Sequence, residues 1–120
     1  MANSSLAVRI LPEIERTLAF GSILAEPVYT PVGTPLLYAS VQLIFQNLTS
    51  GIISFSWDGI NSAFTLNATT SFIMDVQSNK GRGDALMAGQ GTQFWVAYVT
   101  APASGSVYIS SLYSAEFTNK

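Results

Sequence analysis

Short apolar segments, in which every second residue is polar, constrain the fold of this chain more than any other feature. Residues 53–57 read Ile-Ser-Phe-Ser-Trp, so apolar side chains occupy alternate positions. Period-two alternation places those side chains on one face of a β-strand. Asp58-Gly59 follows, a dipeptide that favours a tight turn because Gly tolerates positive φ. The pattern predicts strands joined by turns.

Similar segments recur along the chain, with turn residues about every 8–12 positions, which is typical of a sandwich. Pro27, Pro31 and Pro35 exclude a helix or a central strand from residues 26–35. Residues 92–100 are apolar on both faces, as in a strand that is buried on both sides. We expect strands at residues 18–24, 37–46, 52–57, 63–66, 71–76, 92–100 and 106–113, with a brief one at 85–87. The predicted fold is all-β, an antiparallel and jelly-roll-like β-sandwich of about seven or eight strands.

The N-terminal residues 1–16 are the only stretch that is compatible with a helix. Pro12 suits the first position of a short helical turn, and the apolar residues before it suit an extended arm equally well. We therefore expect an N-terminal arm at residues 1–16, extended or briefly helical, and a single β-sandwich domain at residues 17–120. In an assembly, an apolar arm of this kind often docks on a neighbour, whereas in a monomer it would be an edge strand.

The chain has no histidine and no cysteine, which removes most of the chemistry that enzymes use. Histidine is the commonest acid or base near neutral pH, and cysteine is a readily activated nucleophile. A hydroxyl nucleophile needs a base beside it, and no candidate base stands out in the sequence. Asp58, Asp75 and Asp84 lie on separate segments, without the Asp-x-Asp spacing of a calcium loop. We expect no enzyme activity, no catalytic residues, no cofactor and no metal site.

Charged residues make up 10% of the chain, whereas hydrophobic residues make up 48% and the mean hydropathy is +0.34. No charge lies between Glu26 and Asp58, or between Asp84 and Glu116. A surface this poor in charge resembles the core of a protein interface. The alternative is a neutral monomer that its Ser, Thr, Asn and Gln residues keep soluble. We favour a homo-oligomer, whose interface residues we expect to be Leu6, Val8, Ile10, Leu11, Trp95, Tyr98, Tyr108 and Tyr113.

Other partners are disfavoured by the sequence. The net charge is −2, and Lys80 and Arg82 are the only close basic pair, so we expect no nucleic-acid binding. No apolar run reaches the roughly 18–20 residues that span a bilayer, so we expect no membrane association. Residues 1–5 lack the features of a signal peptide. We expect the chain to be made in the cytoplasm and not secreted by such a signal.

Three short motifs suggest binding roles. Trp57 with Asp58 and Asn61 supplies an aromatic ring, a carboxylate and an amide, the groups that a sugar site on a β-sandwich uses. The alternative is a core Trp at the end of a strand, followed by a hairpin turn. Residues 82–84 read Arg-Gly-Asp, a tripeptide that integrins recognise when it is exposed in a loop. Residues 3–5, 47–49 and 67–69 match the N-glycosylation pattern, although turns rich in Asn and Thr explain them as well. The role of the loop at 78–91 stays open.

Several segments, in this order and spacing, carry a resemblance to a known group of proteins. They are RTLAFGSI (16–23), Tyr29, VGTPL (32–36), QNLT (46–49), ISFSWDG (53–59), DVQSNK (75–80), GTQ (91–93) and SGSVY (104–108). Together they resemble small all-β virion proteins of tailed bacteriophages, over most of the chain from Arg16 to Tyr113. The resemblance implies a structural protein of the virion, present in many copies and contacting itself and other virion proteins.

The resemblance does not separate capsid decoration from a head–tail connector or a tail component. It also implies that no residue is catalytic. The alternative from a different class is a carbohydrate-binding or host-surface adhesion module, in which Trp57, Asp58 and Asn61 would contact a glycan.

Overall fold

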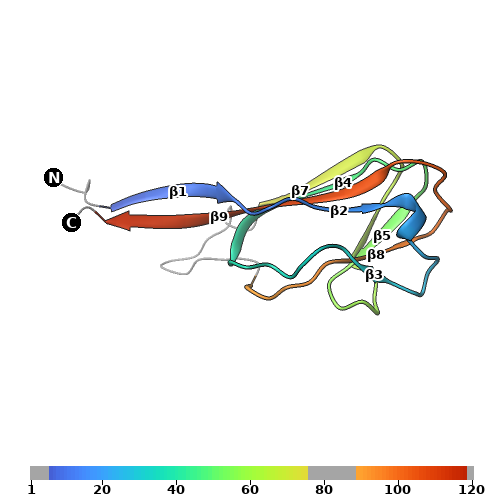
Figure 1. Cartoon of the computed structure of the whole chain (residues 1–120), viewed down its shortest axis with the longest axis horizontal. Coiled ribbons are helices and arrows are strands. Elements are labelled where there is room, and N and C mark those ends of the chain that lie inside the picture. The colour runs from blue at the N-terminus through green and yellow to red at the C-terminus, as the bar shows by residue number, and fades with distance from the viewer. Residues whose placement is uncertain (1–5, 76–88, 119–120) are drawn as a thin grey trace.

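Two antiparallel sheets face each other in the computed structural model, which describes residues 6–75 and 89–118 (Figure 1). The strands of the first sheet are β1 (Leu6–Pro12), β2 (Arg16–Ala19), β4 (Ser40–Asn47), β7 (Thr70–Asp75) and β9 (Ser106–Thr118). Those of the second sheet are β3 (Thr30–Pro31), β5 (Ile53–Ser56), β6 (Phe64–Leu66) and β8 (Trp95–Tyr98). The predicted all-β antiparallel sandwich is therefore confirmed.

The chain passes between the two sheets repeatedly. The first sheet has the order β1-β9-β4-β7, with β2 also pairing with β9, and the second has the order β3-β8-β5-β6. Among the described strands, β5 and β6 are the only consecutive pair that are neighbours in one sheet. This order gives an antiparallel sandwich, and the jelly-roll-like wrapping stays a prediction.

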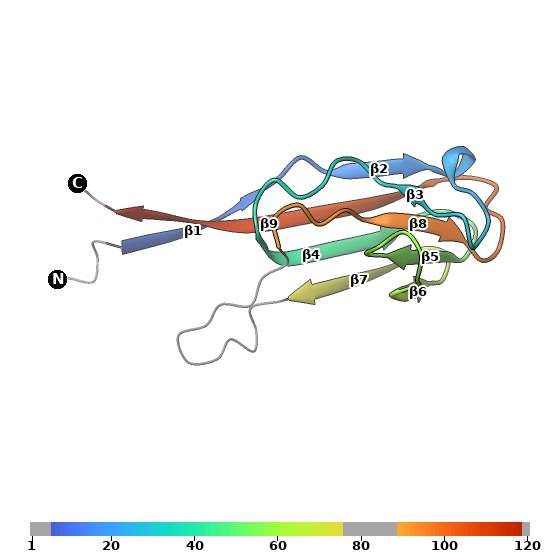
Figure 2. The same ribbon diagram turned by 90° about the horizontal axis from the view of Figure 1, so that it is seen from below.

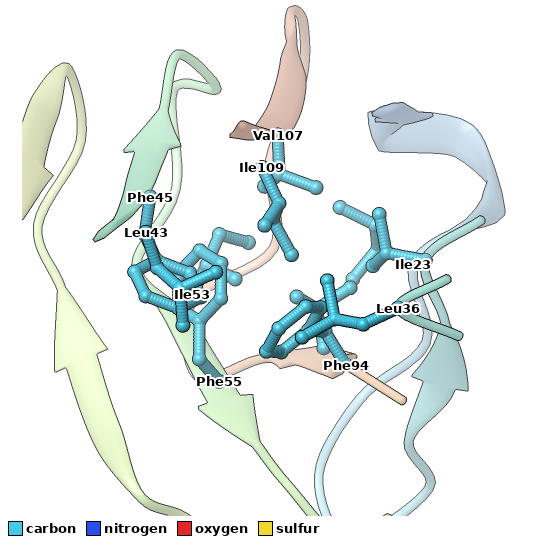
Figure 3. Packing of buried hydrophobic residues seen from close by; sticks show 11 residues of the cluster. Ile23, Leu36, Leu43, Phe45, Ile53, Phe55, Phe94, Val107 and Ile109 are labelled. Carbon is cyan, nitrogen blue, oxygen red and sulfur yellow. The ribbon is translucent and has the colours of Figure 1, made fainter. Parts of the chain in front are cut away.

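One hydrophobic core fills the space between the sheets. Its fully buried members include Leu43 and Phe45 from β4, Phe55 from β5 and Ile109 from β9, which point toward one another in Figure 3. The alternation at 53–57 gives the predicted result. Ile53 and Phe55 lie in the core, and Ser54 and Ser56 lie on the opposite face of β5, where they are buried as well. The predicted central strand is β8, which lies between β3 and β5.

The seven predicted strands that can be compared all have different limits in the structure. The strand expected at 37–46 begins at Ser40, and the one expected at 92–100 is confined to Trp95–Tyr98. The strand expected at 18–24 is β2, and it gives way to a 3₁₀ turn at Phe20–Ser22. The strand expected at 106–113 continues to Thr118, because β1 pairs with every residue from Leu112 onward. The brief strand expected at 85–87 lies outside the described residues.

The described part of the N-terminal arm, residues 6–16, is extended and not helical. β1 runs antiparallel to the end of β9, in register from Leu6↔Thr118 to Pro12↔Leu112. Pro12 does not begin a helical turn here; it ends a strand, a position at which the missing N–H removes no central ladder bond. The arm is thus one half of a two-stranded ribbon, and the C-terminal part of the chain is the other half.

Candidate assembly surfaces

The ribbon of β1 and the end of β9 projects from the sandwich, as both views of the molecule show (Figures 1 and 2). Pairing between β4 and β9 ends at Ser40↔Tyr113. Beyond Tyr113, β9 pairs with β1 alone among the described strands. The molecule is accordingly elongated, with extents of 57 × 24 × 22 Å. An isolated two-stranded hairpin is at best marginally stable in water, so this ribbon is the part of the fold that gains most from a partner.

A buried ion pair anchors the root of the ribbon. The Nη2 atom of Arg16 donates to Oε1 of Glu13 at 2.8 Å, and both side chains are 1% exposed. Arg16 also donates to the carbonyl oxygens of Thr34 and Pro35 and to the hydroxyl of Ser111. One guanidinium thereby joins the end of β1, the segment before β4, and β9.

The carboxylate of Glu13 completes this anchor. It accepts the backbone N–H of Leu37 at 3.2 Å and that of Tyr38 at 3.0 Å. Burial acts to raise the pKa of Glu13, but hydrogen bonds from Arg16, Leu37 and Tyr38, with the charge of Arg16, outweigh burial and hold that pKa below its usual value. Glu13 therefore stays ionised opposite Arg16 at neutral pH.

Gly33 lets the chain close over the Arg16 side chain. Its φ is +65°, and a Cβ atom at this position would lie 2.7 Å from Cγ of Arg16. A residue with a side chain would be strained by both the dihedral angle and the contact. The Gly in the sequence 32–36 thus has a packing role beside the ion pair.

Exposed apolar side chains surround the root of the ribbon. Tyr38 stacks on Tyr113, with ring centroids 4.1 Å apart. Burial, the neighbouring Tyr38 and the charge of Glu13 raise the pKa of Tyr113, so its hydroxyl is neutral in the physiological range. Leu37, which precedes Tyr38, is exposed. Ile10 and Ile14, on either side of the end of β1, are also exposed, Ile14 at 76%. We call Ile14, Leu37, Tyr38 and Tyr113 the root patch. Ile10 is not part of it, because Leu11 stands opposite Tyr113 and Ile10 therefore belongs to the other face of the ribbon.

A second apolar surface lies on the outer face of the first sheet. Leu43 and Phe45 point into the core, so Ile44 between them points outward. Ile44 stands opposite Ile73 of β7 in the register, and Ile73 is 59% exposed. Tyr108 belongs to the same outer face and is half-buried.

The outer face of the second sheet is covered by the protein's own loops. Ser54 and Ala97 are fully buried although they face away from the core. The Tyr29 hydroxyl lies 3.0 Å from that of Ser54, and a Cβ at Gly59 would lie 2.9 Å from the Trp95 ring. This sheet offers little open face to a partner.

The eight residues expected at an interface therefore do not form one surface. Leu6, Val8, Ile10 and Leu11 lie in β1, and the register brings Leu11 opposite Tyr113. Trp95 is half-buried against Gly59, Tyr98 packs on the core, and Tyr108 lies on the other sheet. Three further exposed apolar residues, Ile14, Leu37 and Tyr38, are not among the eight. Ile14 lies between two acidic residues, and Leu37 and Tyr38 were expected inside the strand at 37–46, which begins only at Ser40. For Leu37 and Tyr38, the sequence signal was the uncharged stretch between Glu26 and Asp58.

The residues of the predicted sugar site lie together, but their polar groups are already engaged. Oδ1 of Asp58 accepts the backbone N–H of Ile60 and of Asn61, each at 2.8 Å. Oδ2 of Asp58 accepts from the Asn61 amide at 3.1 Å. These bonds stabilise the turn after β5 and leave the carboxylate and the Asn61 amide with less capacity for hydroxyl groups of a ligand.

Trp57 belongs to an aromatic cluster at the open edge of the sandwich. Its ring lies 5.6 Å from that of Phe45, 5.8 Å from Phe64 and 5.5 Å from Phe94, between centroids. The side chain is 38% exposed. Trp57 thus packs mainly on its own core, and sugar binding stays a prediction.

We expect Asp58 to stay ionised in acid after ordinary aspartates have been protonated. Hydrogen bonds from the backbone of Asn61 and Ile60, then from the side chains of Ser56 and Asn61, hold its pKa well below the usual value. A pKa that is lower in the folded state contributes stability above about pH 4, the unfolded value, and this is lost as the pH falls through the folded pKa. An NMR titration of the Asp58 carboxyl carbon should show no midpoint near pH 4, whereas the urea-unfolded chain should. A folded-state midpoint near that of the unfolded chain would show that the turn does not hold the carboxylate.

The remaining motifs have simple outcomes. Asn47 is fully buried, so a glycan cannot be attached to it in this fold. Three of the predictions fall outside the described residues. They concern the N-glycosylation pattern at 3–5, the Arg-Gly-Asp at 82–84 and most of the loop at 78–91. Between residues 6 and 75 and between 89 and 118, no three acidic side chains gather in a way that would hold a metal ion. The same residues contain no helix long and apolar enough to cross a membrane.

The class of protein that these features define is a small antiparallel β-sandwich with a projecting terminal ribbon. No protein-family model matches the chain, and no curated protein matches it. It is similar to the crystal structure of the SPP1 Dit protein, described as a paradigm of the hub adsorption apparatus in phages that infect Gram-positive bacteria. The likeness covers 88% of this chain and 49% of that one, with 12% sequence identity and a TM-score of 0.37. The chain thus spans about half the length of that protein, and a TM-score of this size carries no argument about function.

Proposed function

We propose that this chain is a structural protein of the virion of a tailed bacteriophage, assembled in many copies through its charge-poor apolar surfaces. The sequence resemblance from Arg16 to Tyr113 supports the class of protein. The observation that carries the assembly is the ribbon, two paired strands that leave the sandwich with the apolar root patch at their base. A role in holding particles together needs no catalytic group, and the partners are other copies and other virion proteins.

The energetics of such an assembly are those of apolar burial. Removing apolar surface from water contributes about 25 cal/mol per Å² before the cost of association is subtracted. The root patch and the outer face around Ile44 and Ile73 supply such surface. Contacts of modest individual strength, repeated by symmetry, give a stable closed particle.

Sedimentation velocity of the purified full-length chain tests the assembly. We expect a defined oligomer whose population grows with concentration, as closed symmetry requires. A single monomeric species up to the solubility limit would contradict the proposal.

The place in the virion is a separate question with its own measurement. The proposal covers three positions: capsid decoration, the head–tail connector and the tail. Gold-labelled antibodies raised against the chain should mark one of these on intact particles in the electron microscope. Particles that carry no label, although unassembled chain in the same preparation is recognised, would exclude a virion role.

A further inference from the structure

The ribbon has two open backbone edges. On one side, β1 is paired with β9 and its other edge has no strand partner among the described residues. On the other side, β9 does not pair with β4 beyond Tyr113, so residues 114–118 have no strand partner on that edge among the described residues. An open edge presents a row of unpaired N–H and C=O groups, which is a template for another strand. The occupant that fits an open strand edge is therefore a strand.

Each edge carries a single charge at its centre. β1 comprises Leu6–Pro12, and its middle residue is Arg9. The open part of β9 comprises residues 114–118, and its middle residue is Glu116. All other residues of the two segments are uncharged. Two edges of similar length thus bear opposite charges at equivalent positions.

This placement decides between the ways in which two copies can pair. If β1 pairs with β1 of a second copy at full overlap and antiparallel, Arg9 stands opposite Arg9. If the open edge of β9 pairs with itself in the same way, Glu116 stands opposite Glu116. Like charges directly opposite each other in a sheet are destabilising, and opposite charges are stabilising. Only β1 against β9 places Arg9 opposite Glu116.

We infer that β1 of one copy adds to the open edge of β9 of the next copy, centred on Arg9 opposite Glu116. This inference rests on the proposed function and specifies its contact. The pairing is head-to-tail, because each copy uses one edge as donor and the other as acceptor. Repetition of such a contact generates a ring when the rotation between copies closes. The charges also act against self-pairing of either edge, and so favour the ring over a two-fold dimer.

Charge reversal in the full-length chain tests this inference. Arg9→Glu places a second carboxylate opposite Glu116, and Glu116→Arg places a second guanidinium opposite Arg9. Replacing an attractive pair by a repulsive one is expected to weaken association by about 2- to 30-fold per contact. Sedimentation velocity over a concentration series measures the effect, with Glu26→Arg as the control for Glu116→Arg. Glu26 is exposed and precedes β3, outside the residues of the ribbon, and its reversal should leave association unchanged.

Mixing the two variants gives the sharper result. In an equimolar mixture, the native Arg9 of a Glu116→Arg copy meets the native Glu116 of an Arg9→Glu copy. At the next contact the two substituted side chains meet, and they again form a pair of opposite charges. We expect the mixture to associate as tightly as the wild type, although each variant alone is weakened. Repair of a contact within one chain cannot produce this rescue, which requires the head-to-tail pairing of two different copies.

The outcomes separate this inference from the proposed function. If the wild type forms oligomers and neither reversal weakens them, the ribbon contact is wrong and assembly through other surfaces stands. If Arg9→Glu changes association but Glu116→Arg does not, Glu116 is not the partner of Arg9, which also overturns the inference. If the wild type stays monomeric, both the inference and the proposed assembly fail. Circular dichroism of each variant should match the wild type, which shows that the fold is intact.

Discussion

Replacing Glu13 by Gln is expected to destabilise the fold by about 3 kcal/mol, the low end of the range for breaking a buried ion pair. Gln keeps the shape and removes the charge, so Arg16 remains buried without a counter-ion. Both side chains are 1% exposed in the native protein, so water cannot replace the lost interaction without rearrangement. We place the value at the low end because the bonds from Leu37 and Tyr38 lie near the surface.

Equilibrium urea denaturation of the two proteins measures this loss as a fall in the midpoint at constant slope. Glu15→Gln is the matched control, two residues away. Glu15 is exposed and accepts one hydrogen bond, from the Ser110 hydroxyl at 3.0 Å, so we expect a change below about 1 kcal/mol. Equal effects of the two substitutions would show that the Glu13–Arg16 pair has no special role.

Replacing both partners refines the interpretation. Glu13→Gln with Arg16→Met leaves no charge in the site, and removing a whole buried pair is often much less costly than removing one partner. We expect partial recovery relative to Glu13→Gln alone. Recovery stays incomplete because the carbonyl oxygens of Thr34 and Pro35 lose their donor. Because the pair joins β1 to the sandwich, the single variant should also loosen the ribbon.

The interior of the sandwich was predictable from the sequence because it depends on local periodicity. Alternation assigned Ile53 and Phe55 to the core and Ser54 to the opposite face, and the structure agrees. The uncharged apolar run at 92–100 correctly indicated a strand between two others. In both places, each residue's position follows from its immediate neighbours and from the period of a strand.

The ribbon was not predictable in the same way. Its two strands come from opposite ends of the chain, and nothing in residues 6–12 indicates that residues 112–118 are their partner. The sequence therefore left a helix and an extended arm equally open. Glu13 and Arg16 are spaced as in a helical turn, three residues apart, yet they pair across the short link between β1 and β2. Long-range pairing overrode the local signal.

The candidate surfaces were only partly predictable for a related reason. Alternation shows which residues share a face of a strand, but not whether a loop covers that face. Trp95 was expected at an interface, and the turn containing Gly59 covers its ring. Asp58 was assigned to a sugar site, and its own turn uses the carboxylate. Which loop covers which face of a sheet is decided only when the whole chain has folded.

Replacing Asn47 by Ala is expected to cost about 3–5 kcal/mol, because several buried polar groups lose their partner at once. The Nδ2 atom of Asn47 donates to the carbonyl oxygens of Gly51, Leu66 and Asn67 at 2.9, 3.0 and 3.0 Å. Its Oδ1 accepts the backbone N–H of Thr49 at 3.0 Å and the Thr49 hydroxyl at 2.6 Å. One side chain thereby fastens the turn after β4 to the turn between β6 and β7.

Asn47→Asp sharpens the same prediction, because a carboxylate has no donor and would face three carbonyl oxygens in a fully buried site. Its loss should exceed that of Asn47→Ala at neutral pH and diminish in acid, where the protonated acid regains one donor. Urea denaturation at both pH values measures this. Asn67→Ala is the matched control: it lies in the same Asn-x-Thr pattern, but it is exposed and contributes only its backbone carbonyl, so we expect a change within about 0.5 kcal/mol. Equal costs of Asn67→Ala and Asn47→Ala would show that burial of the amide does not determine the loss of stability.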